Sequence, residues 1–488
     1  MNPIRQTSTP FLLEISARPW LARTGASLGR RATFDDIPDS DLDRVQALGV
    51  HALWVMGTAR TGPLARRLAL GYPELLATYE RLIPDWVPAD VAGSPFSIAG
   101  YEPPAAAGGW AALANLRRRL NERGIGLVLD FVPNHLGIDH PWLTSHPERF
   151  VRGDARKLAA QPGNWFVHTT PEGEDRVFAH GRDPHFAGWS DTVQIDYRRR
   201  DTRRALADLV LDLAARCDGL RCDVAMLVLP DVFTRTWGPG PADEVGDFWR
   251  EAIAAIRERH PDFALLAEAY WGTGPRLHEA GFDWIYDKDW YDALVSGDVA
   301  AVRGRLASGE LSFGAHVLEN HDETRARTCF GERQRAATAL TFSLPGLRFL
   351  HEGQMEGARD HVPVQIGRAP LEAIDQDSVR WHELLWRALT VPDEATWSAP
   401  EVRAETDGDA PPIVASAWTS PTECRVVVAN LSANDSAGRI ALPGQARGET
   451  IAWTELLTNR TWNARATELA GTSLRLPGWG VEVLRAEL

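Results

Sequence analysis

Short apolar runs and amphipathic stretches alternate along residues 10–390, and each type of segment predicts a different element. Apolar residues recur at helical spacing in the amphipathic stretches, the clearest of which are 109–124, 201–216, 243–260 and 332–342. The apolar runs are strand candidates, and they lie at 11–16, 51–57, 125–135, 219–224, 263–271, 282–287, 314–323 and 346–353. Strands with helices between most of them predict an α/β fold, a (β/α)₈ barrel. A doubly wound open sheet is the alternative.

Two segments interrupt this alternation. Residues 136–195 follow the third strand, are rich in Pro, His, Trp and Gly, and lack a clear period, so we expect an inserted domain B there. Near the end of the chain, helices give way to short β-type runs with turn residues, which predict a C-terminal antiparallel β-sandwich. The predicted domains are a barrel of residues 1–135 and 196–393, domain B at 136–195 and a sandwich at 394–488.

Charge and cysteine content exclude several classes of partner. The 488-residue chain has a net charge of -14, which argues against nucleic acid or an anionic membrane as its partner. Its four cysteines have no metal-type spacing and are too few for a disulfide framework. The first residues lack the apolar core of a signal peptide. We therefore expect a cytoplasmic protein; its oligomeric state does not follow from these features.

Polar residues follow the strand candidates at the ends where (β/α)₈ barrels carry their chemistry. Arg221 and Asp223 share one face of the fourth strand, where a guanidinium favours an ionised carboxylate but also fits a structural ion pair. Similar residues at four strand ends favour a functional site over four separate ion pairs. These candidates are Asp130, Asn134 and His135; Arg221 and Asp223; Glu268; and Asn320, His321 and Asp322.

Four motifs that contain these residues resemble a known family. "DFVPNH", "GLRCD", "LLAEAYW" and "LENHD" are similar, in order and spacing, to the four short conserved regions of glycoside hydrolase family 13, the α-amylase family. "GYEPP" before the third strand and "VQIDY" before the fourth add to the resemblance, which covers about residues 10–390. The motifs do not select a subfamily. The 19 tryptophans are compatible with rings that stack on sugars, although most tryptophans are core residues.

The resemblance implies a role for each matched residue. Asp223 matches the catalytic nucleophile, Glu268 the general acid/base, and Asp322 the acid that binds the 2- and 3-hydroxyls of the distorted sugar. The family retains anomeric configuration through a covalent intermediate, with two carboxyl groups about 5–5.5 Å apart. Glu268 follows the apolar "FALLA", which suits a protonated acid. Substrate-binding residues implied in the same way are Tyr101, Asp130, His135, Arg221 and His321.

The chain also departs from the family pattern, and this leaves hydrolysis and transfer both open. Met226 and Leu227 occupy positions where many members carry Lys-His against the acceptor sugar. The segment 139–150 is similar to the branch that transfers maltose from maltose 1-phosphate, so a maltosyl- or glucosyltransferase is an alternative. A rival from another class is a catalytically inactive amylase-like binding module, against which the presence of all three carboxylates argues.

The same departures predict a short substrate and no cofactor. An apolar Met-Leu pair offers no side-chain hydrogen bond to the hydroxyls of a leaving glucan. The aromatic rings of domain B have two possible roles: they wall off one end of the cleft, or they pack beneath a loop. We therefore expect a di- or oligosaccharide substrate. Calcium-binding relatives use the asparagine that matches Asn134, but residues 136–195 contain only scattered acids. Calcium is possible, yet no metal is predicted.

Overall fold

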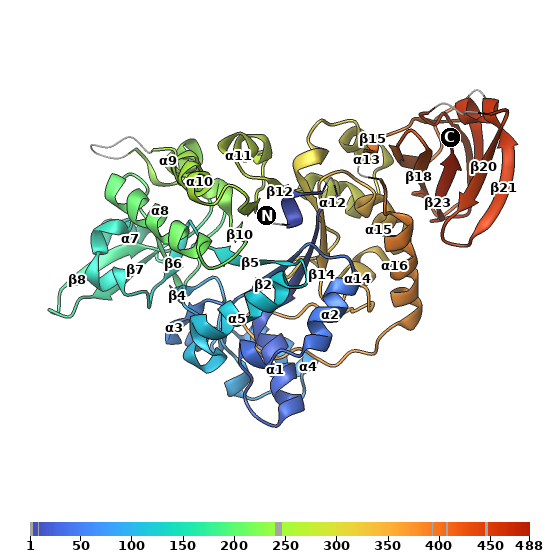
Figure 1. The fold of residues 1–488 in the computed structure, drawn as a ribbon. Helices are drawn as coiled ribbons and strands as arrows, with labels where there is room; N and C mark the ends of the chain where they lie inside the picture. Colours follow the sequence, from blue (N-terminus) through green and yellow to red (C-terminus); the bar gives the residue numbers. More distant parts are fainter. Residues whose placement is uncertain (1–2, 8, 240–245, 393, 407, 445–447) are drawn as a thin grey trace. The chain divides into compact units, whose positions relative to one another are not determined.

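The computed structural model describes residues 3–7, 9–239, 246–392, 394–406, 408–444 and 448–488. Within them, eight parallel strands close into a barrel in the order β1-β14-β13-β12-β11-β10-β5-β2 (Figure 1). This closed order confirms the predicted (β/α)₈ barrel and excludes the open sheet. The strands are β1 Phe11–Ser16, β2 Ala52–Met56, β5 Gly126–Phe131, β10 Gly219–Cys222, β11 Ala264–Ala267, β12 Trp284–Tyr286, β13 Gly314–His316 and β14 Leu347–His351.

Continuous burial explains why these short runs form barrel strands. All residues of β2, β5, β10 and β11 are buried, as expected for parallel strands covered on both faces. Apart from β1, the observed strands are shorter than the predicted runs, mainly because polar residues at the ends of the runs leave the ladder and enter the following loop. In β11, for example, the ladder ends at Ala267, one residue before Glu268.

Helices follow the barrel strands along the chain, close to the predicted positions. The stretches predicted at 109–124, 201–216 and 332–342 form α5, α8 and α15; the one at 243–260 forms α10, and its residues 243–245 lie outside the described residues. Aspartates Asp247, Asp287 and Asp375 cap α10, α12 and α16 by accepting backbone N–H groups. The helices are α1 Ala17–Leu28, α2 Asp39–Ala47, α3 Pro63–Ala69, α4 Pro73–Leu82, α5 Gly109–Asn121, α8 Arg200–Ala214, α9 Pro230–Trp237, α10 Phe248–Arg259, α11 Gly274–Ala280, α12 Lys288–Ser296, α13 Val299–Leu306, α14 Ala326–Phe330, α15 Gln334–Phe342 and α16 Gln376–Ala388.

The segment between β5 and α8 is an excursion from the barrel, as predicted for domain B. It contains one antiparallel pair, β6 with β9, and one hairpin, β7 with β8. A further short pair, β3 Arg60–Thr61 with β4 Ile98–Gly100, precedes it in the chain. The elements of the excursion are β6 His135–Gly137, α6 Trp142–Ser145, α7 Ala155–Ala160, β7 Trp165–Thr169, β8 Asp175–Ala179 and β9 Thr192–Gln194.

Two antiparallel sheets form the C-terminal region, which confirms the predicted sandwich. One sheet has the order β15-β17-β18-β23-β20-β21 and the other β16-β19-β22. They share one apolar core that includes Val426 from the first sheet and Leu474 from the second. The strands are β15 Thr396–Ser398, β16 Val402–Arg403, β17 Ile413–Thr419, β18 Glu423–Asn430, β19 Ser436–Ile440, β20 Thr450–Glu455, β21 Arg460–Arg465, β22 Thr472–Leu476 and β23 Val481–Glu487.

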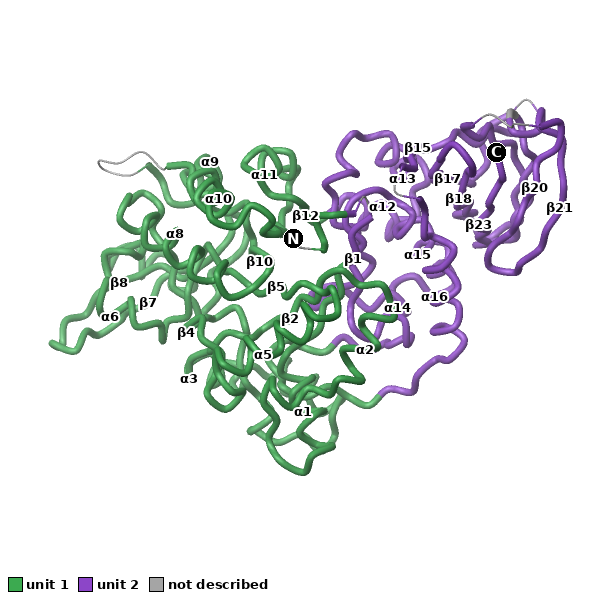
Figure 2. The backbone as a smooth tube through the Cα atoms, in the orientation of Figure 1, with its two compact units in different colours: residues 1–6, 12–286, 362–371 green, residues 7–11, 287–361, 372–488 purple. Residues whose placement is uncertain are grey.

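The chain divides into two compact units (Figure 2). The first contains residues 1–6, 12–286 and 362–371, and the second contains 7–11, 287–361 and 372–488. The domain limits expected from the sequence stay predictions, and the expected barrel end at residue 393 lies outside the described residues. Every helix in the described part of the chain is too short or too polar to cross a membrane.

Candidate active site

Strand register places Asp223 and Glu268 side by side. Cys222 in β10 pairs with Ala267 in β11, so the next residue of each strand leaves the barrel at the same level. The backbone N–H of Glu268 still donates to the Cys222 carbonyl at 3.0 Å, and that of Asp223 donates to the Phe131 carbonyl at 2.8 Å. Both side chains therefore begin at the carboxyl ends of neighbouring strands, and both are buried.

One guanidinium holds the two carboxylates together. Nη1 of Arg221 donates to Oδ1 of Asp223 at 2.5 Å, and Nη2 donates to Oε2 of Glu268 at 2.8 Å. The Arg221 side chain is fully buried, and its carbon Cζ lies 5.0 Å from the centre of the Trp54 ring. Two nearby carboxylates keep the pKa of Arg221 well above its ordinary value, although burial alone would lower it. Arg221 therefore remains a cation that bridges both acids.

Glu268 has more polar contacts than its apolar sequence context indicates. Besides Arg221, the backbone N–H of Val224 donates to Oε2 at 2.7 Å, and the Tyr270 hydroxyl donates to Oε1 at 2.7 Å. Val224 reaches this position with a φ of 36°, a left-handed conformation that is strained for a β-branched residue. The run "FALLA" indicated only the apolar surroundings; the three donors became visible in the fold.

Two tyrosines of this site were not identified from the sequence. Tyr270 bonds Glu268, and the Tyr286 hydroxyl lies 3.1 Å from Nε of Arg221. Tyr286 ends β12, the strand after β11, so its position at a strand end was a usable signal. Tyr270 lies within the motif "LLAEAYW", where the alternation of side chains along an extended segment places residues 268 and 270 on one side.

Tyr101 and Asp130 also lie in the first unit, and protein groups bond both. The Tyr101 hydroxyl donates to the Val132 carbonyl at 3.2 Å, and its ring stacks on Phe131. Burial is the main reason that the pKa of Tyr101 is above its ordinary value. Asp130 accepts from Nε1 of Trp54 at 3.0 Å and from a backbone N–H of the β2 loop at 2.7 Å. These contacts connect the ends of β2 and β5, beside Arg221.

His135 is buried and neutral near pH 7. Burial lowers its pKa to about 3, a shift that the nearby Glu268 carboxylate only partly opposes. Its ring centre lies 5.0 Å from that of Trp189, a residue of the excursion. A neutral imidazole both donates and accepts one hydrogen bond, which suits contact with a sugar hydroxyl.

Buried neutral histidines predict a loss of stability in mild acid. Burial also lowers the pKa of His382 to about 4, so between pH 6.5 and 4 the unfolded chain binds a proton that the folded chain does not. The contribution of each such histidine to the free energy of unfolding is therefore fully present above pH 6.5. It falls as the pH decreases, by about 2 kcal/mol per histidine at pH 5. We expect a lower melting temperature at pH 5 than at pH 7, and a smaller difference in His382→Gln. Equal melting temperatures at the two pH values would contradict this.

The remaining predicted residues, His321 and Asp322, lie in the second unit. Nε2 of His321 is 3.1 Å from a carboxylate oxygen of Asp322, whose side chain is 52% exposed. Oδ1 of Asn320 accepts the backbone N–H of Asp322 at 2.9 Å, and the His361 ring contacts the His321 carbonyl at 2.8 Å. A buried Glu319 anchors this loop by accepting the N–H of Ala326. Asp322 is thus an exposed carboxylate on a firmly bonded loop.

Burial shows where two features of the sequence lie in the fold, namely the Met226-Leu227 pair and the aromatic rings of the excursion. Met226 and Leu227 are buried in a 3₁₀ turn, Ala225–Val228, so their side chains pack in the interior. Of the rings in the excursion, Phe150, Trp165 and Phe178 are also buried, whereas Phe186 is 72% exposed. Trp142, Phe166 and Trp189 are partly buried, so three of the seven rings pack in the interior and Phe186 remains available to a ligand.

Asn134, which matches the calcium-binding asparagine of some relatives, is hydrogen-bonded to another side chain. Oδ1 of Asn134 accepts from Nε2 of Gln194 at 3.1 Å. Within the described residues, no three His, Cys, Asp or Glu side chains are grouped as a metal ion requires. Whether the protein binds calcium stays a prediction.

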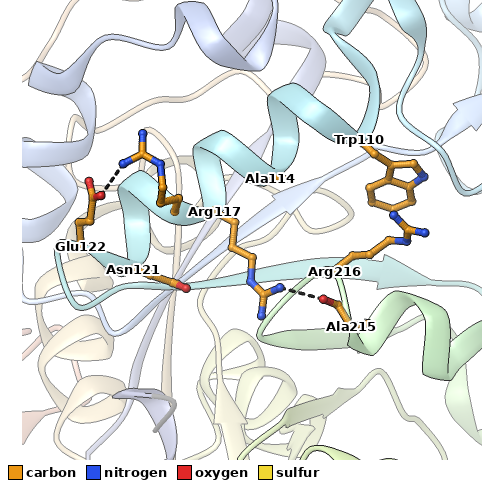
Figure 3. A pocket seen from close by; sticks show the side chains of 8 residues that line it. Trp110, Ala114, Arg117, Asn121, Glu122, Ala215 and Arg216 are labelled. Atoms are coloured by element: carbon orange, nitrogen blue, oxygen red, sulfur yellow. Dashed lines mark hydrogen bonds and ion pairs between the residues drawn. The ribbon is translucent and has the colours of Figure 1, made fainter.

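A hollow of about 680 Å³ lies elsewhere on the first unit, along the outer side of α5 (Figure 3). Its charged groups pair with each other or with backbone: Arg118 with Glu122, and Arg117 with the Ala215 carbonyl at 3.0 Å. The guanidinium of Arg216 covers the Trp110 ring. The hollow reaches residues that precede β10, whereas Asp223 follows β10, so it is separate from the carboxylates.

A (β/α)₈ barrel with paired carboxylates at the ends of β10 and β11 and a C-terminal β-sandwich defines the class of protein. Residues 105–278 match the family model of the α-amylase catalytic domain. This part of the chain is similar to the α-amylase family, glycoside hydrolase family 13.

Individual relatives and solved structures show the same similarity in sequence and in fold. The chain is 27% identical to Alpha-amylase MalA of Haloarcula japonica over 448 residues, which cover 88% of this chain and 57% of that protein. It therefore spans less than two thirds of this relative's length. Among solved structures, an α-amylase from Lactobacillus plantarum has a TM-score of 0.69 at 20% identity, covering 99% of this chain and 100% of that one. A maltogenic α-amylase, AmyB from Thermotoga neapolitana, also has a TM-score of 0.69, at 18% identity, covering 98% and 99%.

Proposed function

We propose that this protein is a retaining glycosidase or transglycosidase that acts on the O-glycosyl bonds of α-glucans or α-glucosides. The observation that carries the proposal is the bridge from Arg221 to both Asp223 and Glu268 at the ends of neighbouring strands. Two carboxylates within reach of one guanidinium fit the short separation that retention requires. An inactive binding module would have no need of a buried, charged cluster of this kind, which is costly to desolvate.

The proposed reaction proceeds in two displacements. Asp223 attacks the anomeric carbon while Glu268 donates a proton to the leaving oxygen, which gives a covalent glycosyl-enzyme. Glu268 then accepts a proton from water or from an acceptor hydroxyl as that oxygen displaces Asp223. Arg221 orients both acids, and the Tyr270 hydroxyl positions Glu268. Tyr101 and His135 contact the sugar in this proposal, with Asp130 supporting the site beside Arg221.

The motif match implies roles for Asp322 and His321 as well. Asp322 would bind two sugar hydroxyls and stabilise the distorted ring, while His321 would contact another hydroxyl. The support for these roles is the motif match together with the exposure of the Asp322 carboxylate and the hydrogen bonds that fix its loop. An acid of this type contributes by bonds that strengthen in the transition state, so its loss lowers kcat more than it raises KM.

A product screen tests the proposal and separates hydrolysis from transfer. The purified protein is incubated with maltose, maltodextrin, trehalose, sucrose and maltose 1-phosphate. Release of an α-configured product supports a retaining α-glucoside-active enzyme, since retention preserves the anomeric configuration. Longer chains made from maltose 1-phosphate would identify the maltosyltransferase alternative. Absence of any product with all five substrates would contradict the proposed function.

We further propose a short substrate, and long amylose provides the test. Met226 and Leu227 are buried, so they supply no polar contact to a glucan chain beyond the cleavage point. Because a sugar site depends on its hydrogen bonds, a long leaving chain gains little there. We expect mean chain length to fall slowly relative to the release of reducing ends. A rapid fall at low conversion would show internal cutting and rule out a short-substrate enzyme.

A further inference from the structure

A largely buried network of three side chains lies at the carboxyl ends of β13 and β14. The last paired residues of the two strands are His316 and Arg348, and three residues further along each segment come Glu319 and His351. The same register brings these two side chains to one level, where Nδ1 of His351 lies 3.3 Å from Oε1 of Glu319. Arg325 is the third member, because its Nη1 donates to both atoms at 2.6 Å.

These bonds determine the protonation state of His351. A guanidinium is only a donor, so Nδ1 of His351 must carry a lone pair and accept the hydrogen bond. The imidazole is therefore neutral, with its proton on Nε2. In this arrangement His351 is a neutral acceptor that, together with the Glu319 carboxylate, fixes the two hydrogens of Nη1 of Arg325.

Arg325 also contacts the backbone that follows β14. Its Nη2 donates to the Glu352 carbonyl at 2.8 Å, directly after His351. Gly353 comes next with a φ of 89°, and a Cβ at this position would lie 2.5 Å from Nη2 of Arg325. Glycine suits both the left-handed backbone and the close approach, because it has no Cβ. The chain after β14 therefore leaves space for the Arg325 guanidinium.

The same network closes the loop that carries Asp322. Glu319 begins this loop and Ala326 ends it, and Oε2 of Glu319 accepts the Ala326 N–H at 2.5 Å. Between them, Oδ1 of Asn320 accepts the N–H groups of Asp322 and Glu323, at 2.9 Å each. The Glu319 carboxylate therefore fixes the distance between the two ends of the loop, and Asp322 lies near its middle.

Stability alone does not account for a buried charged network of this kind. Glu319 is fully buried and the side chain of Arg325 is only 9% exposed, so both charges have lost most of their contact with water. Replacing such a pair by apolar side chains is often neutral or stabilising, because the cost of desolvation offsets the attraction. The donors of a guanidinium have fixed directions, however, so the network restricts the loop to one conformation.

We propose that His351 is a positioning residue: by accepting from Arg325 it fixes the Glu319 carboxylate and, through the loop, the Asp322 carboxylate. This inference rests on the proposed function, in which Asp322 binds two sugar hydroxyls and stabilises the distorted ring. Bonds that strengthen in the transition state depend steeply on position, and a displacement of about 1 Å can lower a rate about 100-fold. The network therefore contributes to kcat through Asp322.

His351→Leu tests the proposal, because leucine fills the space and removes the acceptor. On the substrate that the product screen identifies, we expect kcat to fall between about 10-fold and 100-fold, with KM within about twofold of the wild type. His351→Asn is the conservative variant, since its Oδ1 takes the place of Nδ1 and accepts from Arg325. Its kcat should stay within about threefold of the wild type.

His351→Gln is a second variant for the case that His351→Leu does not fold. The longer side chain places its amide near the Nε2 position, so it keeps a polar group and loses the acceptor at the Nδ1 position. We expect the same loss of kcat as in His351→Leu. His382→Gln is the matched control, because His382 is a buried histidine of the same unit that bonds the Ser378 carbonyl at 2.8 Å. Its kcat should equal that of the wild type, whatever its melting temperature.

A double-mutant cycle with Asp322→Asn separates positioning from a general structural role. If the network acts through Asp322, His351→Leu lowers kcat little further in the Asp322→Asn background, whereas independent effects multiply. The same factor in both backgrounds, an equal loss in His351→Asn, or no loss in either His351→Leu or His351→Gln overturns the inference alone. If Asp322→Asn keeps wild-type turnover, or the product screen yields no product, the proposed function is wrong and this inference with it.

Discussion

Asp223→Asn and Glu268→Gln are each expected to lower turnover by about 10⁴-fold or more while the protein stays folded, since each removes an essential partner of one displacement. Both changes replace a charged oxygen with an isosteric amide. The carboxylates they remove are the two that Arg221 bridges. The measurement is kcat on whichever substrate the product screen identifies, with the melting temperature recorded for each variant.

Azide rescue separates the two roles. In Glu268→Ala, azide attacks the glycosyl-enzyme without needing a general base, so an activated donor should yield the glycosyl azide of retained, α configuration. In Asp223→Ala, azide replaces the missing nucleophile and attacks the donor directly, so the product should have the inverted, β configuration. The reverse pattern would exchange the two assignments.

Asp218→Asn is the control for this pair, because Asp218 is a carboxylate just before the other end of β10. It pairs with Arg117 at 2.8 Å and accepts the backbone N–H of Leu127 at 2.8 Å. We expect a lower melting temperature with turnover near that of the wild type. If Asp223→Asn and Glu268→Gln behave like this control, the carboxylates are structural and the assigned mechanism is wrong.

Arg221→Met is expected to have the largest effect on stability, about 3–5 kcal/mol, because it leaves two buried carboxylates without their shared cation. Methionine has a comparable length and no charge, so loss of the ion pairs dominates over loss of volume. The contact of the guanidinium with the Trp54 ring is also lost. Urea unfolding of wild type and variant measures the difference.

A double-mutant comparison identifies the cause of that loss. In a background with Asp223→Asn and Glu268→Gln, the partners are neutral, so Arg221→Met should cost much less than in the wild type. A similar cost in both backgrounds would show that Arg221 contributes packing rather than charge compensation. The comparison therefore tests whether one cation maintains the site.

How far the sequence predicts the site is clear from the two central acids. Asp223 and Glu268 are recognisable because each follows a short apolar run, and parallel strands of a barrel bring such positions to one end. Of the two contacts of the Arg221 guanidinium, the sequence predicted one. The i, i+2 spacing pairs Arg221 with Asp223, whereas the bond from Arg221 to Glu268 depends on the register of β10 against β11. Register is a property of two strands, and neither run specifies it alone.

The residues that the sequence did not identify, or whose surroundings it did not show, have the same explanation. Met226 and Leu227 were interpreted by their place in a motif, yet a 3₁₀ turn buries both. Tyr270 and Tyr286 lie near the site through hydrogen bonds, which a one-dimensional pattern does not record. Burial of the domain B rings likewise depends on how the excursion folds.

The sequence by itself determined the class of fold, because the hydrophobic period is a local property of the chain. Its short motifs, which are local as well, indicated the resemblance to the α-amylase family and the candidate acids. Only the tertiary structure decided which groups bond those acids, which rings are exposed and that Val224 takes a left-handed conformation. These features depend on contacts between segments far apart in sequence, and their energies arise when the segments pack and exclude water.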